Sequence, residues 1–425
     1  MWIFVEPFDV LLFRDAKPFT AGENFRVSST FPPLSLPFAG AIRGKILTDA
    51  GVDLADYRER VRNHDPLPLA EAIGGPDGYG KLRIRGPFLW RKGGKDEEEG
   101  AAYFPIPNDL LFRQMTQEER RRPLHLRPAP LPWEGIVTNA PGFPKLPLWS
   151  RKEGDVPEEQ ERLIPLPPLI DDLLGNRASA MEESPAPHYR ESRSGLALGR
   201  GRTARPGLKY TVDFIRLSKN FGFLLEVSGA GEAHLREGGI FPLGGEGRPA
   251  RYYRLTAEAT KGVTELFEGE AFRKQLEGKL VGRKRFKLYL PAPALFRQGW
   301  LPDFLEETPR GIEGRIGALE VRLLCAAVGK GIPLSGWDLA RNCPRPLRLA
   351  VPAGSVYFLE KLGDQPLTEA EVAQLFEGVH GKSLQRLDPV TNHRGSEELE
   401  REVEEKGKIG FGLALLGYVE PETGM

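Results

Sequence analysis

The stretch GKIGFGLALLGYV, from Gly407 to Val419, decides which kind of fold the rest of the chain must fit. Its spaced glycines resemble a nucleotide-binding loop. The G-x-G-x-x-G motif of such loops opens a helix, however, and an acidic ribose ligand follows about 20 residues later. Here the apolar run continues with strand composition to Tyr418 and Val419. We therefore expect a glycine-rich loop that leads into a strand, and the loop either lets a nucleic acid approach its backbone or forms a bulge.

The composition indicates a large globular chain without net charge. Its 425 residues suffice for two domains, which we expect at residues 1–187 and 188–425. Basic and acidic residues both number 59, so the total charge favours neither a nucleic acid nor an acidic ligand. Two cysteines without zinc-site spacing fit a reducing cytoplasm. Charged residues interrupt the apolar N-terminal run, so we expect neither a signal peptide nor a membrane span.

Periodicity predicts a helix in FPPLSLPFAGAIRGKILTDAG, near the N-terminus. Pro37 suits the first helical position, and Gly51 is a natural stop. One apolar stripe follows the helical repeat; it consists of Ile42, Ile46, Leu47 and Ala50. From Gly74 to about Pro187 the chain is rich in proline, glycine and charge, which favours long loops and insertions on a scaffold.

The second half of the sequence mixes strands and a helix. FGFLLEVSG, KRFKLYLPAP and GSVYFLEKL have strand composition. LTEAEVAQLFEG predicts a helix with a capping box from Thr368 to Glu371, and Val372, Leu375 and Phe376 face inward. Because both halves combine strands and helices in mixed order, we predict an α+β fold with two related sandwich-like units.

Several features resemble catalytic or metal sites but are better explained otherwise. GVHGKS, from Gly378 to Ser383, lies after a helix, whereas a P-loop precedes one. The six histidines show no metal-ligand spacing, and the acidic runs 96–99 and 397–405 indicate solvated faces. We therefore predict no catalytic residue, no metal and no cofactor.

The basic clusters are more informative. YRESRSGLALGRGRTARPGLKY predicts two strands joined by a projecting basic loop, because its glycines and Pro206 prevent a regular core element. Arginine forks pair with phosphate oxygens and glycine permits close approach, so this loop is suited to an RNA backbone. A solvated surface hairpin is the alternative. VGRKRFKLYLPAPALFR alternates basic and aromatic residues, as base-stacking strands do, although ordinary two-faced strands look the same.

Two further stretches are candidate anion sites. The start of the helix in SLPFAGAIRGK has free N–H groups, with Ser35 as a donor and the small residue Gly40 allowing close approach. An ordinary packed helix is the alternative. FPLGGEGRPARYY adds a glycine turn before Arg248 and Arg251.

Together these stretches resemble the RAMP proteins of CRISPR systems, and in particular the family of the third subunit of the type III-B Cmr effector complex. The likeness covers nearly the whole chain. The matching stretches are LFRDAKPF, LSLPFAGAIRG, RSGLALGRGRTARPGLKY, LGGEGRPARYY, SGWDLARNCPRPLRLAVPAGSVYF and GKIGFGLALLG.

The resemblance implies two ferredoxin-like, RRM-type units with long loop insertions. It implies a non-catalytic protein that grips the 5' repeat-derived tag of the guide RNA, the crRNA. The implied protein partners are the large polymerase-like subunit and neighbouring RAMP backbone subunits. The candidate RNA contacts are Ser35, Gly40, Arg43, Lys45, Arg193, Arg200, Arg202, Thr203, Arg205, Gly244, Gly245, Arg248, Lys408, Gly410, Phe411 and Gly412.

The alternative is an enzyme, a metal-independent endoribonuclease that processes CRISPR repeat RNA. Such cleavage needs a general base near a 2'-hydroxyl and a cation that stabilises the phosphorane. His188 and Arg190 could fill these roles. The motifs of the second half favour the binding protein.

Overall fold

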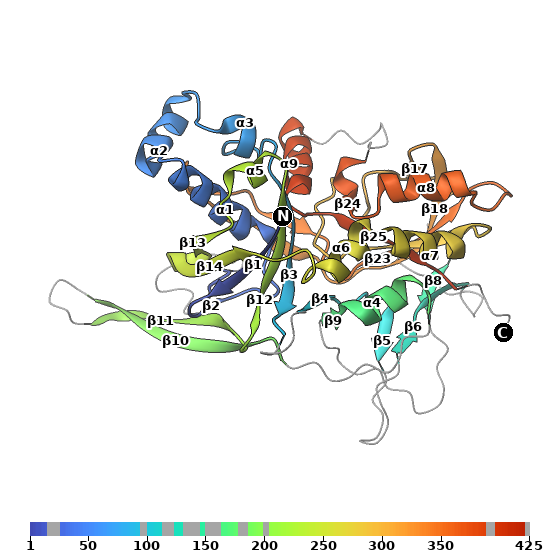
Figure 1. Ribbon diagram of the computed structural model, residues 1–425, viewed down its shortest axis with the longest axis horizontal. Coiled ribbons are helices and arrows are strands. Elements are labelled where there is room, and N and C mark those ends of the chain that lie inside the picture. The colour runs from blue at the N-terminus through green and yellow to red at the C-terminus, as the bar shows by residue number, and fades with distance from the viewer. Residues whose placement is uncertain are drawn as a thin grey trace, which may run out of the picture.

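The computed structural model describes residues 1–14, 26–93, 100–112, 123–130, 145–148, 163–176, 186–198, 204–387 and 396–420. Two antiparallel sheets form its centre (Figure 1). Within the described residues, the strand order of the first sheet is β13 (Gly238–Leu243), β14 (Arg248–Arg254), β1 (Trp2–Pro7), β12 (Phe221–Ser228), β3 (Arg83–Arg91), β4 (Ala101–Pro105) and β9 (Leu163–Pro165).

The second sheet contains C-terminal strands. Its order is β16 (Leu305–Thr308), β17 (Gly311–Ile316), β18 (Leu319–Ala327), β23 (Val356–Lys361), β15 (Arg285–Tyr289), β25 (Leu413–Tyr418) and β24 (Lys382–Ser383). A separate sheet contains β10 (His188–Leu198), β11 (Ala204–Leu217) and β2 (Arg26–Ser28). Short pairs complete the strands: β5 (Leu110–Phe112) with β6 (Pro123–His125), β7 (Arg127–Ala129) with β8 (Leu146–Leu148), β19 (Ile332–Leu334) with β22 (Arg348–Ala350), and β20 (Trp337–Asp338) with β21 (Cys343–Pro344).

The helices pack around both sheets (Figure 1). Those near the first sheet are α1 (Ser35–Asp49), α2 (Leu54–Asn63), α3 (Ala70–Ile73) and α5 (Ala230–His234). Those near the second sheet are α4 (Leu166–Leu173), α6 (Lys261–Glu268), α7 (Glu270–Leu280) and α8 (Glu369–Gly378). Helix α9 (Glu397–Lys408) precedes β25, and the short 3-10 turns are η1 (Gly245–Gly247) and η2 (Leu384–Arg386).

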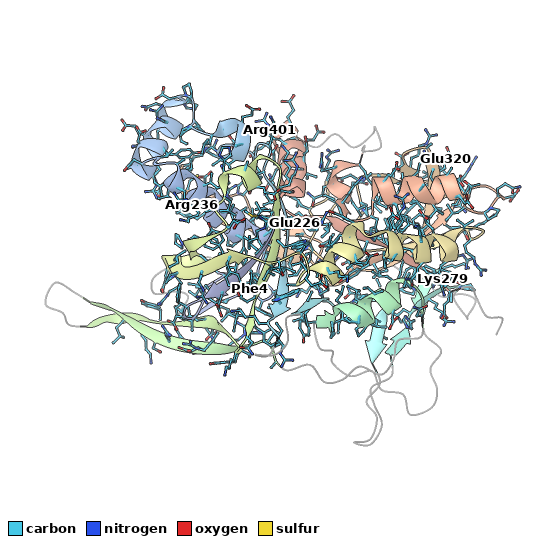
Figure 2. The ribbon with its side chains drawn as sticks, in the orientation of Figure 1. Phe4, Glu226, Arg236, Lys279, Glu320 and Arg401 are labelled. Carbon is cyan, nitrogen blue, oxygen red and sulfur yellow. The ribbon has the colours of Figure 1, made fainter. Side chains whose placement is uncertain are left out.

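Strand β1 shows why the first sheet is buried on both faces. Its side chains alternate, so Ile3 and Val5 pack with α1 while Trp2 and Phe4 face the other core. That other core also contains the second sheet, so the two halves of the molecule share one continuous apolar cluster. Figure 2 shows Phe4 in the interior and Lys279, Glu320 and Arg401 on the outside.

The predicted N-terminal helix is confirmed as α1. It begins two residues before Pro37, and Ile42, Ile46 and Leu47 are buried as expected. Ala50 is the exposed C-cap and does not extend the stripe. Gly51 follows with φ +76°, a left-handed conformation that favours glycine and ends the helix.

The predicted elements of the second half are also present. The three strand-like stretches form β12, β15 and β23. Helix α8 begins with the expected capping box between Thr368 and Glu371. The stretch GVHGKS begins with the last residue of this helix and contains His380, which is buried. The Nε2 atom of His380 bonds the Leu266 carbonyl at 2.8 Å, and its Nδ1 accepts from the Leu416 N–H at 3.2 Å. This segment is therefore part of the core.

The sheets do not follow the expected division at residues 187 and 188. Strands β12 and β14 lie beyond residue 188, yet both pair with β1. The change from one sheet to the other falls between Arg254 and Arg285. Strands β3 and β4 come from the stretch expected to be loops, where Pro and Gly obscure the pattern: Gly86 and Pro87 lie within β3 itself.

A buried charge cluster attaches α4 and the segment before β5 to the second sheet. Lys287 on β15 donates to Asp109 at 2.7 Å and to Asp172 of α4 at 2.9 Å, and each side chain is at most 3% exposed. The Asp172 carboxylate also lies 3.3 Å from Nδ1 of His125. Burial raises the pKa of Asp109, whereas Lys287 and His125 together outweigh burial and lower the pKa of Asp172.

Candidate functional site

The predicted basic hairpin exists and projects from the molecule. Strands β10 and β11 pair antiparallel from His188 opposite Leu217 to Leu198 opposite Ala204. This two-stranded ribbon extends away from the first sheet at the lower left of Figure 1. Arg200, Arg202 and Thr203 lie outside the described residues; Arg205 lies in β11, but its side chain is not described. The structure therefore describes the side chains at the base of the ribbon.

Three arginines meet at the base of this ribbon. Arg193 of β10 and Arg248 of β14 both lie over the ring of Phe214, each guanidinium carbon 5.3 Å from the ring centroid. Arg216 is two residues from Phe214 on β11, so it shares that face. Sequence reasoning named Arg193 and Arg248 but missed Arg216 and Phe214. The strand alternation of β11 was the signal that could have found them.

Carboxylates hold these arginines. Glu191 accepts hydrogen bonds from Arg193 and Arg216, at 2.7 and 2.6 Å for the closest atoms. Asp9, in the connection after β1, accepts from Arg216 at 2.8 Å and from Arg193 at 3.4 Å.

The hydrogen bonds between arginines and carboxylates determine the electrostatics at the base of the ribbon. The hydrogen bonds from Arg216 and Arg193 lower the pKa of Glu191. The pKa of Asp9 is also lowered, because the bond from Arg216 and the nearby charges outweigh partial desolvation. Arg248 is 2.8 Å from Glu246 and 3.7 Å from Asp9. Each arginine at the ribbon base therefore has an acidic partner.

The glycine turn at Gly244 and Gly245 positions Arg248. Gly245 donates its N–H to the carbonyl of Leu12 at 2.7 Å. Gly244 has φ +72°, and a Cβ there would lie 2.6 Å from the same carbonyl oxygen. The glycines thus seat the turn against the segment that carries Asp9. This contact brings two predicted stretches, distant in sequence, to one place.

The candidates on α1 are engaged in internal contacts. Arg43 donates to the carbonyl of Gly75 at 2.6 Å and lies over the ring of Tyr79. Lys45 pairs with Asp49 at 2.7 Å, one turn further along the helix. Ser35 is buried, whereas Gly40 is exposed and has open space where a Cβ would stand.

The glycine loop before β25, where we expected RNA contacts, packs inside the molecule. Phe411 is only 1% exposed and belongs to the core around α1. Gly410 has φ +94°, and a Cβ there would lie 2.9 Å from the carbonyl oxygen of Gly86 on β3. Gly412 donates to the Pro293 carbonyl at 2.7 Å, and Lys408 pairs with Glu405. The loop fastens the C-terminal strand to the first sheet.

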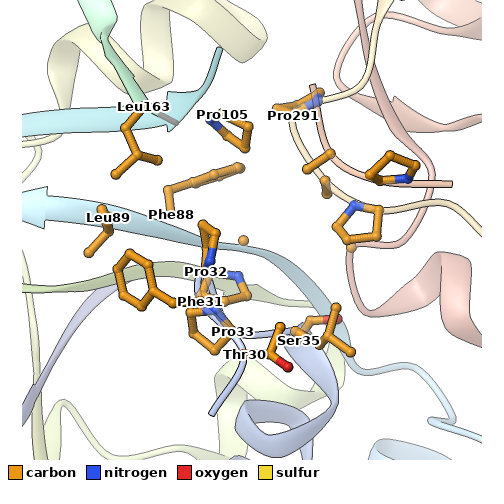
Figure 3. Close-up of a pocket in the computed structure, with 18 of the residues that line it drawn as sticks. Thr30, Phe31, Pro32, Pro33, Ser35, Phe88, Leu89, Pro105, Leu163 and Pro291 are labelled. Carbon is orange, nitrogen blue, oxygen red and sulfur yellow. The ribbon is translucent and has the colours of Figure 1, made fainter. Parts of the chain in front are cut away.

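A cavity of about 310 Å³ lies where the two halves meet (Figure 3). Segments from both halves line it, including Thr30, Ser35, Phe88, Pro291 and Gly410. Its lining is mainly apolar, and the lining residues carry no charged side chain. The space is therefore suited to a neutral group.

The groups invoked for the alternative enzyme contact the segment between β2 and α1. His188 stacks on Phe31 with ring centroids 3.7 Å apart, and Arg190 donates to the carbonyl of Ser29 at 3.0 Å. Within the described ranges, no group of three His, Cys, Asp or Glu side chains could hold a metal ion. No helix in the described part of the chain is long and apolar enough to cross a membrane.

Comparison with known proteins identifies the family of this chain. The sequence profile described as "CRISPR-associated protein (Cas_Cmr3)" matches residues 3–419, and the chain belongs to this family. No curated protein matches the sequence.

Solved structures show a weaker likeness. A chain of the "Type III-B Cmr-beta bound to cognate target RNA and AMPPnP, state 1" is 14% identical, with a TM-score of 0.45 over 97% of this chain and 95% of that one. The "Type III-B Cmr-beta bound to cognate target RNA" gives the same values. A chain of the "Csm3-Csm4 subcomplex in the type III-A CRISPR-Cas interference complex" is 12% identical, with a TM-score of 0.33 over 86% of this chain and 97% of that one.

Proposed function

We propose that this chain is a non-catalytic, guide-RNA-binding subunit of a type III-B CRISPR antiviral ribonucleoprotein. It holds the 5' repeat-derived tag of the crRNA and docks on the large polymerase-like subunit. Membership of the Cmr3 family supports the assembly. The observation that carries the RNA-binding role is the meeting of Arg193, Arg216 and Arg248 at the base of a projecting ribbon.

The ribbon is suited to a phosphate backbone for geometric reasons. Guanidinium forks bind phosphate oxygens in pairs, and two of them, from Arg193 and Arg248, lie over the ring of Phe214. Arg200 and Arg202, in the stretch of sequence that joins β10 to β11, stay candidates for further phosphate contacts. Arg43, Lys45 and Phe411 are not part of this proposal, because their contacts are internal.

We also propose that the two sheets correspond to two ferredoxin-like units. In each sheet four central strands follow the order 4-1-3-2 by position in the chain. These strands are β14-β1-β12-β3 in the first sheet and β25-β15-β23-β18 in the second. In this proposal the first unit extends to β14, so the chain divides after Arg254 rather than at residue 187.

Protein partners have a candidate surface as well. In the hairpin around residues 332–350, four apolar side chains are more than half exposed: Trp337, Leu339, Leu347 and Leu349. Clustered exposed apolar groups mark protein interfaces in soluble proteins. We assign this hairpin to contacts with the large subunit or with neighbouring RAMP backbone subunits.

The test is RNA binding by the full chain across a range of salt concentrations. Arg193→Ala with Arg248→Ala should weaken binding of a tag-bearing single-stranded RNA and lower the salt slope by about 0.7 for each lost phosphate contact. Arg322→Ala is the matched control, because Arg322 is similarly exposed and paired with Glu313 on the second sheet. An unchanged salt slope in the double variant would refute the assignment of this surface to RNA binding. Cleavage of the RNA by purified protein, abolished by His188→Ala, would favour the endoribonuclease.

A further inference from the structure

The carboxylates at the ribbon base use the same guanidinium positions that a phosphate would need. Both oxygens of Glu191 accept hydrogen bonds, one from Arg193 and the other from Arg216. Both oxygens of Asp9 are engaged in the same way, by Arg216 and by Arg193. Carboxylate and phosphate bind a guanidinium fork in the same bidentate geometry. The two kinds of anion therefore exclude each other at these atoms.

The charges of the side chains at the base of the ribbon cancel. Arg193, Arg216 and Arg248 supply three positive charges, and Asp9, Glu191 and Glu246 supply three negative ones. RNA affinity arises largely from cations that neutralise phosphates and release counterions. A balanced cluster gives little of this attraction until its carboxylates move away.

A phosphate can physically replace a carboxylate at this surface. The side chains of these six residues are 28–47% exposed, so water can solvate a carboxylate that leaves. Exposed ion pairs of this kind contribute little to stability. The Lys287 cluster is the contrast, because its groups are at most 3% exposed and have no solvent to move into.

We propose that Asp9 and Glu191 form a carboxylate bridge that occupies the phosphate positions of the ribbon arginines and competes with RNA for them. This inference rests on the proposed function. RNA displaces the bridge only where further contacts hold its backbone at the ribbon. The bridge thus weakens binding of single phosphates and of short, unspecific RNA relative to the guide.

The experiment removes the competing charge and keeps the shape. Asp9→Asn, Glu191→Gln and the double variant of the full chain are titrated with a labelled tag-bearing RNA and with oligouridine of the same length. Each single variant should bind roughly two- to fivefold more tightly at low salt, from the worth of one exposed ion pair. The salt slope should rise by up to about 0.7 for each carboxylate removed. Oligouridine should gain more affinity than the tag-bearing RNA.

Glu313→Gln is the matched control, since Glu313 pairs with Arg322 away from the ribbon and should leave RNA affinity unchanged. Weaker or unchanged binding by Asp9→Asn and Glu191→Gln would overturn the proposal; weaker binding would mean that the carboxylates only position the arginines. If those variants weaken binding and Arg193→Ala with Arg248→Ala weakens it too, only the bridge fails. If the arginine variant has no effect, the proposed RNA surface fails first. Equal thermal midpoints show that folding is intact.

Discussion

Replacement of Lys287 by methionine tests whether the buried charge cluster stabilises the fold. In the native protein one ammonium group faces two carboxylates, Asp109 and Asp172, and all three side chains are at most 3% exposed. Methionine has similar length but leaves both carboxylates without their cation. Removing one partner of a buried ion pair costs about 3–5 kcal/mol. We therefore expect Lys287→Met to lower the free energy of unfolding by about that amount at pH 7.

The stability difference between wild type and Lys287→Met should also change with pH in a definite direction. The pKa of Asp172 is lowered in the folded protein, chiefly by Lys287 against the opposing effect of burial. Stability from this group is present above its unfolded pKa of about 3.9 and is lost as pH falls through the folded value. Removal of Lys287 takes away the largest of the interactions that lower this pKa. Burial raises the pKa of Asp109, so this group protonates above its ordinary range. The difference between wild type and variant should therefore shrink as the pH falls from there to below about pH 4.

Urea unfolding of both proteins at pH 7 and at lower pH measures these differences. Lys274→Met is the control, because Lys274 pairs with Glu270 at the surface, where both side chains are at least 74% exposed. Exposed helical pairs of this kind contribute about 0.3–0.5 kcal/mol. A Lys287→Met effect no larger than the Lys274→Met effect would refute the reasoning. The triple variant with Asp109→Asn and Asp172→Asn should recover part of the loss.

Two further predictions concern the core. Gly410→Val with Gly412→Val should lower the thermal midpoint, because both positions have positive φ and strain of about 1–3 kcal/mol per residue is expected; an unchanged midpoint with weakened RNA binding would instead restore the loop as an RNA contact. His380 has its pKa lowered by burial to about 4, so stability should fall as pH drops from about 6.5 towards 4, by roughly 3 kcal/mol in all. His380→Gln should remove that dependence in acid titrations of stability, and a pH profile identical to wild type would contradict it.

Local signals in the sequence predicted local structure well. The stop at Gly51, the capping box at Thr368 and the two-stranded ribbon each depend on residues within a few positions of one another. The family was also identified from motifs of this kind, and the profile match over residues 3–419 confirms it.

Contacts between distant segments were not predictable in this way. Arg43 looked available for phosphate, but its partner, the carbonyl of Gly75, lies across a chain reversal that no local pattern encodes. The glycines at 410 and 412 require positive φ, as expected of such a loop, yet the close neighbour is the backbone of β3. Sequence shows that a backbone comes close, but not whether a strand or an RNA approaches it.

The position of β1 has a consequence for the way the protein is made. Both neighbours of Trp2–Pro7 come from beyond residue 220, at β12 and β14. At a synthesis rate of about 5–20 residues per second, the first strand leaves the ribosome on the order of 10 to 50 s before its partners exist. During that time an apolar strand has two open edges, which is the condition for misassociation with other chains. Nascent-chain chaperones should therefore bind its first residues, and an expressed fragment that stops at residue 187 should aggregate, because it never receives either partner.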